Sequence, residues 1–139
     1  MSVPPPTFEE ISARLSNHAV FAVIAETLDK WQPPSTPEGR RVLHEHYLWL
    51  LEAQKRGSLV VAGPLNMELA GPGAPAPIGA PSGLLVFRAA SRADAEALAH
   101  QDPLHRSGFR RNIVCAWSIR WTVPPVSAAL EALLATPLG

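Results

Sequence analysis

Two residues in separate helical regions carry the clearest possibility of chemistry in this sequence. Asp102 follows the helical run that ends at His100 and precedes Pro103, while His46 lies within the other strong helix of the central region. A histidine whose ring is oriented by a carboxylate can accept or donate a proton at its second ring nitrogen. The pair therefore suggests general acid–base chemistry, with His46 moving the proton and Asp102 orienting and charge-stabilising the imidazole.

Both residues also have an ordinary structural interpretation. His46 lies at the edge of an apolar helical stripe that we expect to face a sheet and that contains Leu43, Tyr47, Leu50, Leu51 and Gln54. An Asp-Pro step commonly starts a turn in which the Asp side chain bonds its own backbone. The sequence alone leaves the catalytic and the structural interpretations open.

Other polar residues near this pair are candidates for contacts with a ligand. His44 and His46 are two residues apart and point about 200° from each other on a helix, so they cannot chelate one metal ion. Because no further His, Cys or Asp cluster has metal-ligand spacing, we expect no metal site. We expect Trp49 in the apolar pocket lining and His105 and Arg106 as substrate contacts. Arg110 and Arg111 add positive charge nearby, so all four basic residues are candidates to bind an anionic substrate. Solvated surface charge is the simpler alternative for all four.

The surrounding sequence predicts the framework that positions these residues. Apolar and β-branched runs predict strands, and capping residues and Gly or Pro stops delimit the helices. In chain order we expect a strand at 19–28, a helix at 37–56, a strand at 58–62 stopped by Gly63-Pro64, a strand at 84–89, a helix at 91–100, a loop or short turn at 102–108 and a strand at 111–123. This order is the split-βαβ pattern of a ferredoxin-like α+β sandwich.

Shorter or irregular segments complete the expected framework. A Gly- and Pro-rich connection of polyproline II character is expected over 65–82, between the two halves of the split-βαβ pattern. Helices are expected at 8–16, where Thr7 and Glu10 fit a capping box, and at 126–134.

Both faces of the expected sheet are apolar. In the first strand, Val23 and Ala25 point to one face while Ala22 and Ile24 point to the other. In the last strand, one face carries Ile113, Cys115, Trp117, Ile119 and Trp121. Two helices cover only one face, so we expect the sheet of a second copy to cover the other in a two-fold homodimer. Cys115 is expected to be a small buried hydrophobic residue.

Composition limits the class of protein. The chain has 139 residues, a one-domain length, and we expect one domain with a core at 19–122 and extensions at 1–18 and 123–139. Its 12 basic and 12 acidic residues give a formal net charge of zero, which argues against nucleic acid or an anionic membrane as a partner. No apolar run approaches the roughly 20 residues of a membrane span. With no signal-peptide pattern and one cysteine, we expect a cytoplasmic protein.

Several segments, in order, resemble the YciI-like (YCII-related) family of dimeric α+β barrels. These segments are His46-Tyr-Leu-Trp-Leu, the stretch from Gln54 to Gly63-Pro64, Gly83-Leu-Leu-Val-Phe, and Ala93 to Asp102-Pro103 followed by Gly108. Together they cover about residues 19–122. The family often carries an Arg three residues before its histidine, where this chain has Leu43. Arg41 stands three residues before His44, so a shifted alignment would select His44, but the distance to Gly63-Pro64 favours His46.

The resemblance implies a function as well as a fold. It identifies His46 and Asp102 as the active-site pair of a small enzyme without a cofactor. The implied reaction is lyase-, isomerase- or dehydrochlorinase-like and acts on a small cyclic or aromatic metabolite. A non-catalytic small-molecule-binding or interaction module is the alternative. A third interpretation is a structural accessory protein whose proline-rich connection docks a partner.

Overall fold

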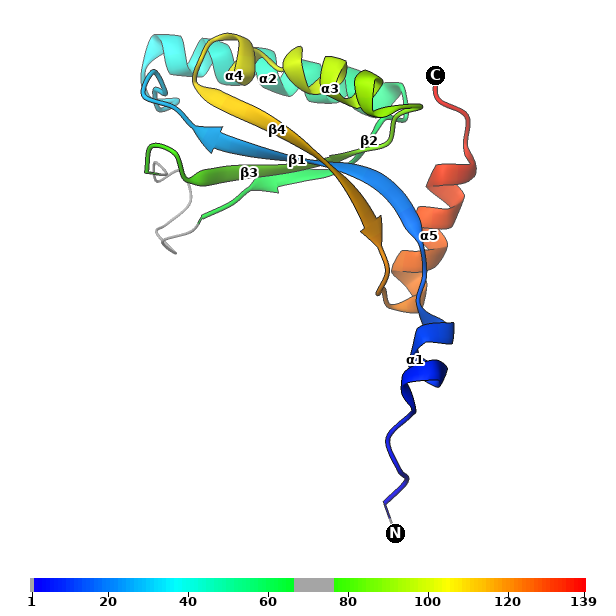
Figure 1. The fold of residues 1–139 in the computed structure, drawn as a ribbon. Helices are drawn as coiled ribbons and strands as arrows, with labels where there is room; N and C mark the ends of the chain where they lie inside the picture. Colours follow the sequence, from blue (N-terminus) through cyan, green and yellow to red (C-terminus); the bar gives the residue numbers. More distant parts are fainter. Residues whose placement is uncertain (1, 67–76) are drawn as a thin grey trace.

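The computed structural model describes residues 2–66 and 77–139 and has an antiparallel sheet with helices on both faces (Figure 1). The strands are β1 (His18–Thr27), β2 (Leu59–Pro64), β3 (Pro81–Phe87) and β4 (Arg110–Ile119). The helices are α1 (Phe8–Arg14), α2 (Pro37–Lys55), α3 (Arg92–His100), α4 (Pro103–Arg106) and α5 (Pro124–Ala135). Residues 67–76 of the connection expected over 65–82 lie outside the described residues.

The strand order confirms the expected ferredoxin-like α+β topology. The four strands lie in the order β2-β3-β1-β4, and every neighbouring pair is antiparallel. The first strand is central, with Val23 opposite Leu85 on one side and Val114 on the other. A central strand packs on both faces, which explains why β1 is apolar along nearly its whole length.

The helices begin at the capping residues that the sequence indicates. The Thr36 hydroxyl accepts a hydrogen bond from Gly39 N (3.0 Å), and the Ser91 hydroxyl accepts one from Asp94 N (3.1 Å). Such caps satisfy backbone donors that have no partner inside the helix. The second helix ends before Gly57, whose φ of 75° lies in the left-handed region that glycine adopts without strain. These local signals fix where the helices carrying the candidate residues start and stop.

Several expected strand boundaries were wrong. The second strand runs through Gly63 and Pro64 instead of stopping before them. It lies at the edge of the sheet, where a proline without an N–H is tolerated. The third strand begins at Pro81 and ends at Phe87, because Gly83 pairs with both Ala25 and Pro64. The fourth ends at Ile119 instead of Val123, and α4 forms most of the expected turn at 102–108.

The main core lies between the sheet and helices α2 and α3. Phe87 and Val23 are fully buried there, and the edge of Trp49 packs against the Phe87 ring with centroids 5.5 Å apart. Ala95 and Ala99 are also buried and let α3 approach the sheet closely. Burying a side chain such as Phe87 stabilises the fold by about 1.5–3 kcal/mol. This packing holds the two helices that carry or precede His46 and Asp102.

The face that α2 turns inward differs from the expected one. Val42, His46 and Ala53 are buried, whereas Tyr47 and Leu51 are 55% and 51% exposed. The stripe expected to face the sheet was therefore wrong by part of a turn. The reason is a second contact surface, because Val42 packs with Leu104 and Phe109 in a smaller cluster. This contact rotates α2 towards α4 and brings His46 inward from the edge of the stripe.

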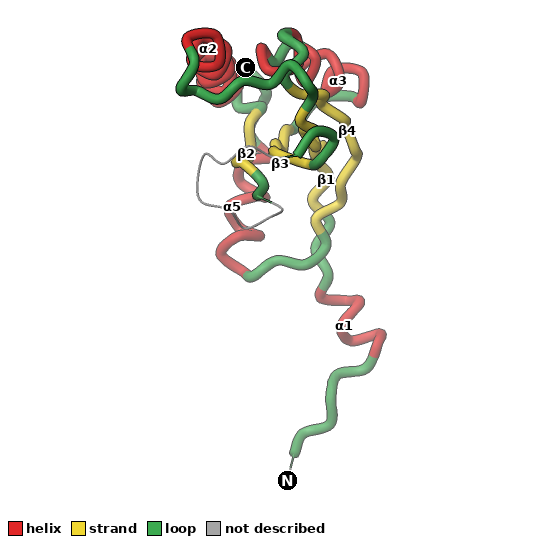
Figure 2. Tube along the Cα trace, turned by 90° about the vertical axis from the view of Figure 1, so that its left-hand side faces the viewer, coloured by secondary structure: helices red, strands yellow, loops and turns green. Residues whose placement is uncertain are grey.

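The C-terminal helix α5 covers part of the second face of the sheet, opposite α2 and α3 (Figure 2). Leu130 is buried, His18 Nε2 lies 3.0 Å from Ser127 Oγ, and the Arg88 guanidinium donates to the Leu133 carbonyl (2.7 Å). The expectation that only a second copy would cover this face was thus wrong in part. The remainder is open in the single chain. Cys115, expected to be buried, is exposed there, and Trp117 is 43% exposed.

The N-terminal segment extends away from the sheet and its helices (Figures 1 and 2). Helix α1 has no buried residue, and Phe8 is 80% exposed. Ser16 joins the segment to the end of β4 by bonding to the Arg120 and Ile119 carbonyls. Among the described residues, no helix is long and apolar enough to cross a membrane.

Candidate active site

His46 and Asp102 meet at the layer of helices above the sheet. His46 lies on the inward side of α2, and Asp102 caps the short helix α4 directly after α3. Their side chains, 56 residues apart in the chain, approach to 2.6 Å between His46 Nδ1 and Asp102 Oδ1. His46 is 6% exposed and Asp102 is 1% exposed. The structure thus brings together the two residues that the sequence singles out.

Asp102 also makes the backbone bond that the turn interpretation predicts. Its Oδ1 accepts a hydrogen bond from Leu104 N (2.9 Å) while also contacting His46. The other oxygen, Oδ2, accepts one from Asn112 Nδ2 (3.0 Å). Both carboxylate oxygens are therefore held by neighbours, which fixes the orientation of the carboxylate against the imidazole. The Asp102 side chain therefore both caps the turn at Leu104 N and contacts His46.

Asn112, on β4, is a part of this site that the sequence reasoning missed. Its Nδ2 donates to both the Ala99 carbonyl (2.9 Å) and Asp102 Oδ2 (3.0 Å). Two acceptors on the same atom assign the orientation of the amide. Its backbone N–H donates to His105 Nδ1 (3.1 Å). The signal that could have found it is the alternation in β4, which puts the Asn112 amide on the same side of the strand as the core residue Val114.

The hydrogen bond to Asp102 assigns the state of the His46 ring. A carboxylate oxygen accepts, so Nδ1 carries the proton and neutral His46 has its lone pair on Nε2. The Trp49 and Tyr47 rings lie beside the imidazole, with centroids 5.7 and 6.0 Å from it. An oriented imidazole with one free nitrogen is the arrangement that a general base requires.

A cavity reaches this histidine. It has a volume of about 240 Å³ and is lined by Leu43, His46, Tyr47, Leu50, Ala62, Gly63, Pro64, Gly83, Leu85 and Arg110. A neighbouring cavity of about 300 Å³ shares four of these residues, Leu43, Tyr47, Pro64 and Arg110. Mostly apolar walls with a few polar groups are typical of small-molecule sites, and these volumes suit a small ligand.

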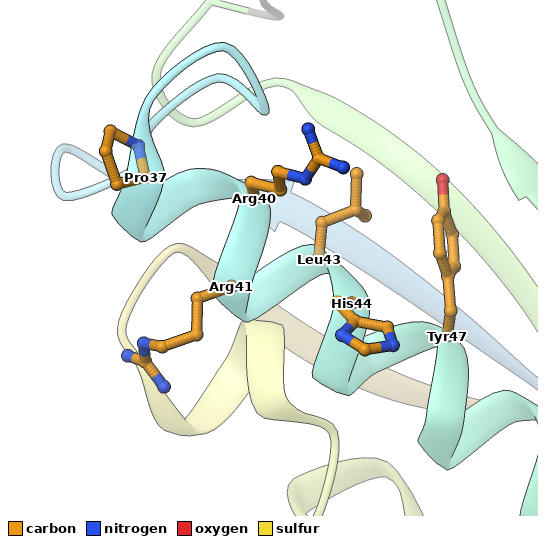
Figure 3. Close-up of a pocket in the computed structure, with 6 residues that line it drawn as sticks. All are labelled: Pro37, Arg40, Arg41, Leu43, His44 and Tyr47. Carbon is orange, nitrogen blue, oxygen red and sulfur yellow. The ribbon is translucent and has the colours of Figure 1, made fainter.

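A larger hollow of about 620 Å³ lies at the outer side of α2 and contains His44 but neither His46 nor Asp102 (Figure 3). Figure 3 shows Arg40, Leu43 and Tyr47 pointing to one side of the helix, while Arg41 points away from it. His44 is exposed, and Arg41 is paired with Glu38 (2.6 Å) and Glu45 (2.8 Å). This hollow is open and has no buried polar group, so the smaller cavity beside His46 is the better candidate site.

The three residues expected to contact substrate lie in different surroundings. Trp49 packs between His46 and Phe87 and lines neither cavity. His105 also lies outside both, with its ring stacked on His100 at 4.8 Å, and Arg106 is exposed. Burial and the neighbouring His100 lower the pKa of His105, with the Asp102 carboxylate acting in the opposite direction. The basic residue that lines both cavities is Arg110.

Metal chemistry has no obvious set of ligands in the described part of the chain. Within residues 2–66 and 77–139, no group of three or more His, Cys, Asp and Glu side chains is arranged to hold a metal ion.

Comparisons with known proteins place the chain in a family. Residues 20–118 match the YCII-related domain family. The chain belongs to the YCII-related family. A search of curated proteins found no match.

The YCII-related chain is also similar in structure to 5-chloro-2-hydroxyhydroquinone dehydrochlorinase from Burkholderia phenoliruptrix AC1100, solved in complex with 2,5-dihydroxybenzoquinone. The two share 20% sequence identity with a TM-score of 0.50, over 70% of this chain and 92% of the dehydrochlorinase. At this level of identity the likeness concerns the fold.

Proposed function

We propose that this YCII-related protein is a small enzyme that works without a cofactor by His46–Asp102 acid–base catalysis. Its substrate would be a small cyclic or aromatic metabolite, and its reaction a lyase, isomerase or dehydrochlorinase type of proton transfer. The observation that carries the proposal is the buried 2.6 Å contact between His46 Nδ1 and Asp102 Oδ1, next to a cavity that His46 lines. The dehydrochlorinase with a similar fold supports the reaction class.

In the proposed mechanism, the chain's own residues move one proton. Nε2 of neutral His46 takes a proton from a carbon or hydroxyl of the bound substrate, and the electron pair left behind forms the new double bond. In an elimination the leaving group departs with its bonding electrons, and in an isomerisation His46 returns the proton to another atom. Asp102 stabilises the imidazolium formed in between, which lowers the barrier to proton transfer.

The first test follows the pair itself and needs no substrate. We expect the NMR signals of the His46 ring nitrogens to differ between Asp102→Asn and wild type, because the variant replaces the carboxylate that contacts Nδ1. Glu45→Gln, which changes a carboxylate on the exposed side of the same helix, should leave those signals unchanged. Unchanged His46 signals in Asp102→Asn would argue against a functional pair.

The second test concerns turnover. 5-Chloro-2-hydroxyhydroquinone is the first compound to assay, by chloride release, together with related halogenated and hydroxylated rings. Turnover by wild type that is lost in His46→Gln would support the enzyme. Saturable binding of a ring compound without turnover, equal in wild type and His46→Gln, would instead favour a non-catalytic binding module.

The proposal includes a homodimer formed through the open part of the second sheet face. This area contains Cys115 and Trp117, and Ile113 beside them is 37% exposed. Apolar surface of this kind on a sheet is usually covered by a partner, and a second copy is the simplest one. Sedimentation should give a dimer for wild type and for Leu48→Glu on the outer side of α2, and a monomer for Trp117→Glu. A monomeric wild type would contradict this part of the proposal.

We propose the cellular setting from the composition of the chain. A zero formal net charge suggests no nucleic-acid or membrane partner, and a single cysteine suits the cytoplasm because no intrachain disulfide is needed. We also propose that residues 1–139 form one YCII-related domain with terminal extensions. Limited proteolysis should then remove α1 and leave a stable product that contains residues 19–122.

A further inference from the structure

Arg110 lies where the two cavities meet. It is the first residue of β4, and its side chain shares the helix-facing side of the sheet with Asn112 two residues later. It lines both the 240 Å³ cavity that contains His46 and the 300 Å³ cavity beside it. A ligand that fills either cavity would contact the Arg110 side chain.

The charges around Arg110 are unbalanced. No carboxylate is present among the described residues that line the two cavities. Asp102, whose charge acts on Arg110, already accepts hydrogen bonds on both oxygens from other groups. Arg111 shows the contrast, since it points to the other face of the sheet and pairs with Glu26 at 2.9 Å. Within residues 2–66 and 77–139, Arg110 is the basic residue that lines both cavities, and it has no ion pair with an acid there.

The guanidinium of Arg110 is also incompletely hydrogen-bonded. Its Nε is buried and has no partner among the described residues. Burial lowers the pKa of this guanidinium, and Asp102 and Tyr47 act in the opposite direction. Arginine stays charged under such a shift, so the site holds a partly desolvated cation. A cation of this kind binds most favourably to an anion that supplies the missing acceptors.

Gly83 makes room for this cation. A Cβ atom built on Gly83 would lie 3.1 Å from Nη1 of Arg110, closer than ordinary contacts allow. A side chain at position 83 would therefore push the guanidinium away by a few tenths of an ångström. Gly83 on β3 and Arg110 on β4 both line the 240 Å³ cavity.

We propose that Arg110 binds the negative charge of the substrate, so that the substrate class is a small ring carrying a carboxylate, phenolate or enolate oxygen. The anionic oxygen would bind the guanidinium, and the ring would extend through the same cavity to His46. This inference rests on the proposed function, because it names the substrate class of the same site. It assigns to Arg110 alone the anion-binding role that the sequence suggested for His105, Arg106, Arg110 and Arg111.

The test compares a charged and an uncharged probe of similar shape. Benzoate and benzyl alcohol are titrated into wild type, Arg110→Gln, Arg110→Lys and the control Arg111→Gln. Wild type should bind benzoate more tightly than benzyl alcohol. Arg110→Gln should weaken the affinity for benzoate roughly 10- to 100-fold, because a hydrogen bond to a charged group is lost. The affinity for benzyl alcohol should not change. Arg110→Lys should fall in between, and Arg111→Gln should match wild type.

The outcomes separate this inference from the proposed function. The NMR signals of the His46 ring report the integrity of the His46–Asp102 pair in every variant. A selective loss of affinity for benzoate in Arg110→Gln, with the His46 signals unchanged, would support the inference. Equal benzoate binding in wild type and both Arg110 variants, or no preference for benzoate in wild type, would overturn it. Either negative result would leave the ring-signal test of the His46–Asp102 pair standing.

Discussion

The two sides of helix α2 each carry a histidine, and the two residues have different surroundings. His46 faces inward, is 6% exposed and contacts the buried Asp102 at 2.6 Å. His44 is exposed beside a wide hollow on the outer side. Both belong to the same helix and differ by two positions in the chain. The comparison teaches that the partner and the burial of a histidine, not its presence on a helix, decide what it can do chemically.

The largest difference between the two sides should appear in catalysis. On any substrate that wild type turns over, His46→Ala should lower kcat by about 10²–10⁴-fold, because the proton acceptor is lost. His44→Ala should stay within about twofold, since no carboxylate orients that ring. Steady-state kinetics with circular dichroism as a check of folding would measure both. Equal losses in the two variants would break the comparison.

The next largest difference between the two sides of α2 should appear in the free energy of unfolding. Asp102→Ala leaves the His46 ring and Leu104 N without their acceptor and Asn112 Nδ2 with one acceptor of its two, so the free energy of unfolding should fall by about 2–4 kcal/mol. Glu45→Ala removes an acid from an exposed pair with Arg41 and should leave the urea midpoint nearly unchanged. Urea unfolding of the two variants gives the result. A small loss in Asp102→Ala would mean that water replaces the missing carboxylate.

A smaller effect is expected from Asn112, which donates a hydrogen bond to Asp102 Oδ2. Asn112→Ala should lower the free energy of unfolding by about 1–3 kcal/mol, because it removes the Asn112 donor from a buried Asp102 oxygen and from the Ala99 carbonyl, which keeps its bond from Asp102 N. It should also change the His46 ring signals, because the orientation of Asp102 is no longer fixed. Asn17→Ala, an exposed position, serves as the control. A loss of stability with unchanged His46 signals would limit Asn112 to a structural role.

The smallest expected effect is the pH dependence that His105 contributes. Its pKa is lowered in the folded protein, so the unfolded chain binds the proton more readily. Stability from this residue is therefore present above the ordinary histidine pKa of about 6.5 and declines as the pH falls below it. Protonation of Nδ1 would also remove the acceptor of the Asn112 N–H.

Thermal unfolding between about pH 7.5 and pH 5.5, a range that spans the ordinary histidine pKa, would measure this contribution. His105→Gln should lose less stability over that range than wild type. A steeper decline in the variant would show that the sign is wrong.

Much of the framework could be predicted from local patterns in the sequence. Pro37 and the Ser91 cap placed the starts of α2 and α3, and a run of β-branched and aromatic residues placed β1. Errors occurred where pairing across the sheet decides a boundary. Gly63 and Pro64 look like a stop in isolation, yet they pair with β3 as an edge strand. The inward rotation of α2 was also missed, because it depends on contact with Leu104 and Phe109, far along the chain.

The candidate site was likewise predicted only in part from local sequence patterns. The sequence singled out His46 and Asp102 but not Asn112, and it did not favour Arg110 over Arg106 or Arg111. Which arginine faces a cavity depends on the register of β4 against β1, where Arg110 pairs with Thr27 and Arg111 with Glu26. A shift of one residue in that register would exchange their faces.

By itself, the sequence determined the order of strands and helices, their caps, the two apolar faces of the sheet and a histidine and an aspartate worth pairing. These features arise from interactions between residues close in the chain. Only the tertiary structure decided that His46 faces inward, that Asn112 supports Asp102, that Arg110 faces the cavities and that α5 covers part of the second face. Each of these depends on packing between segments distant in sequence, and no local pattern encodes the relative rotation of two surfaces in contact.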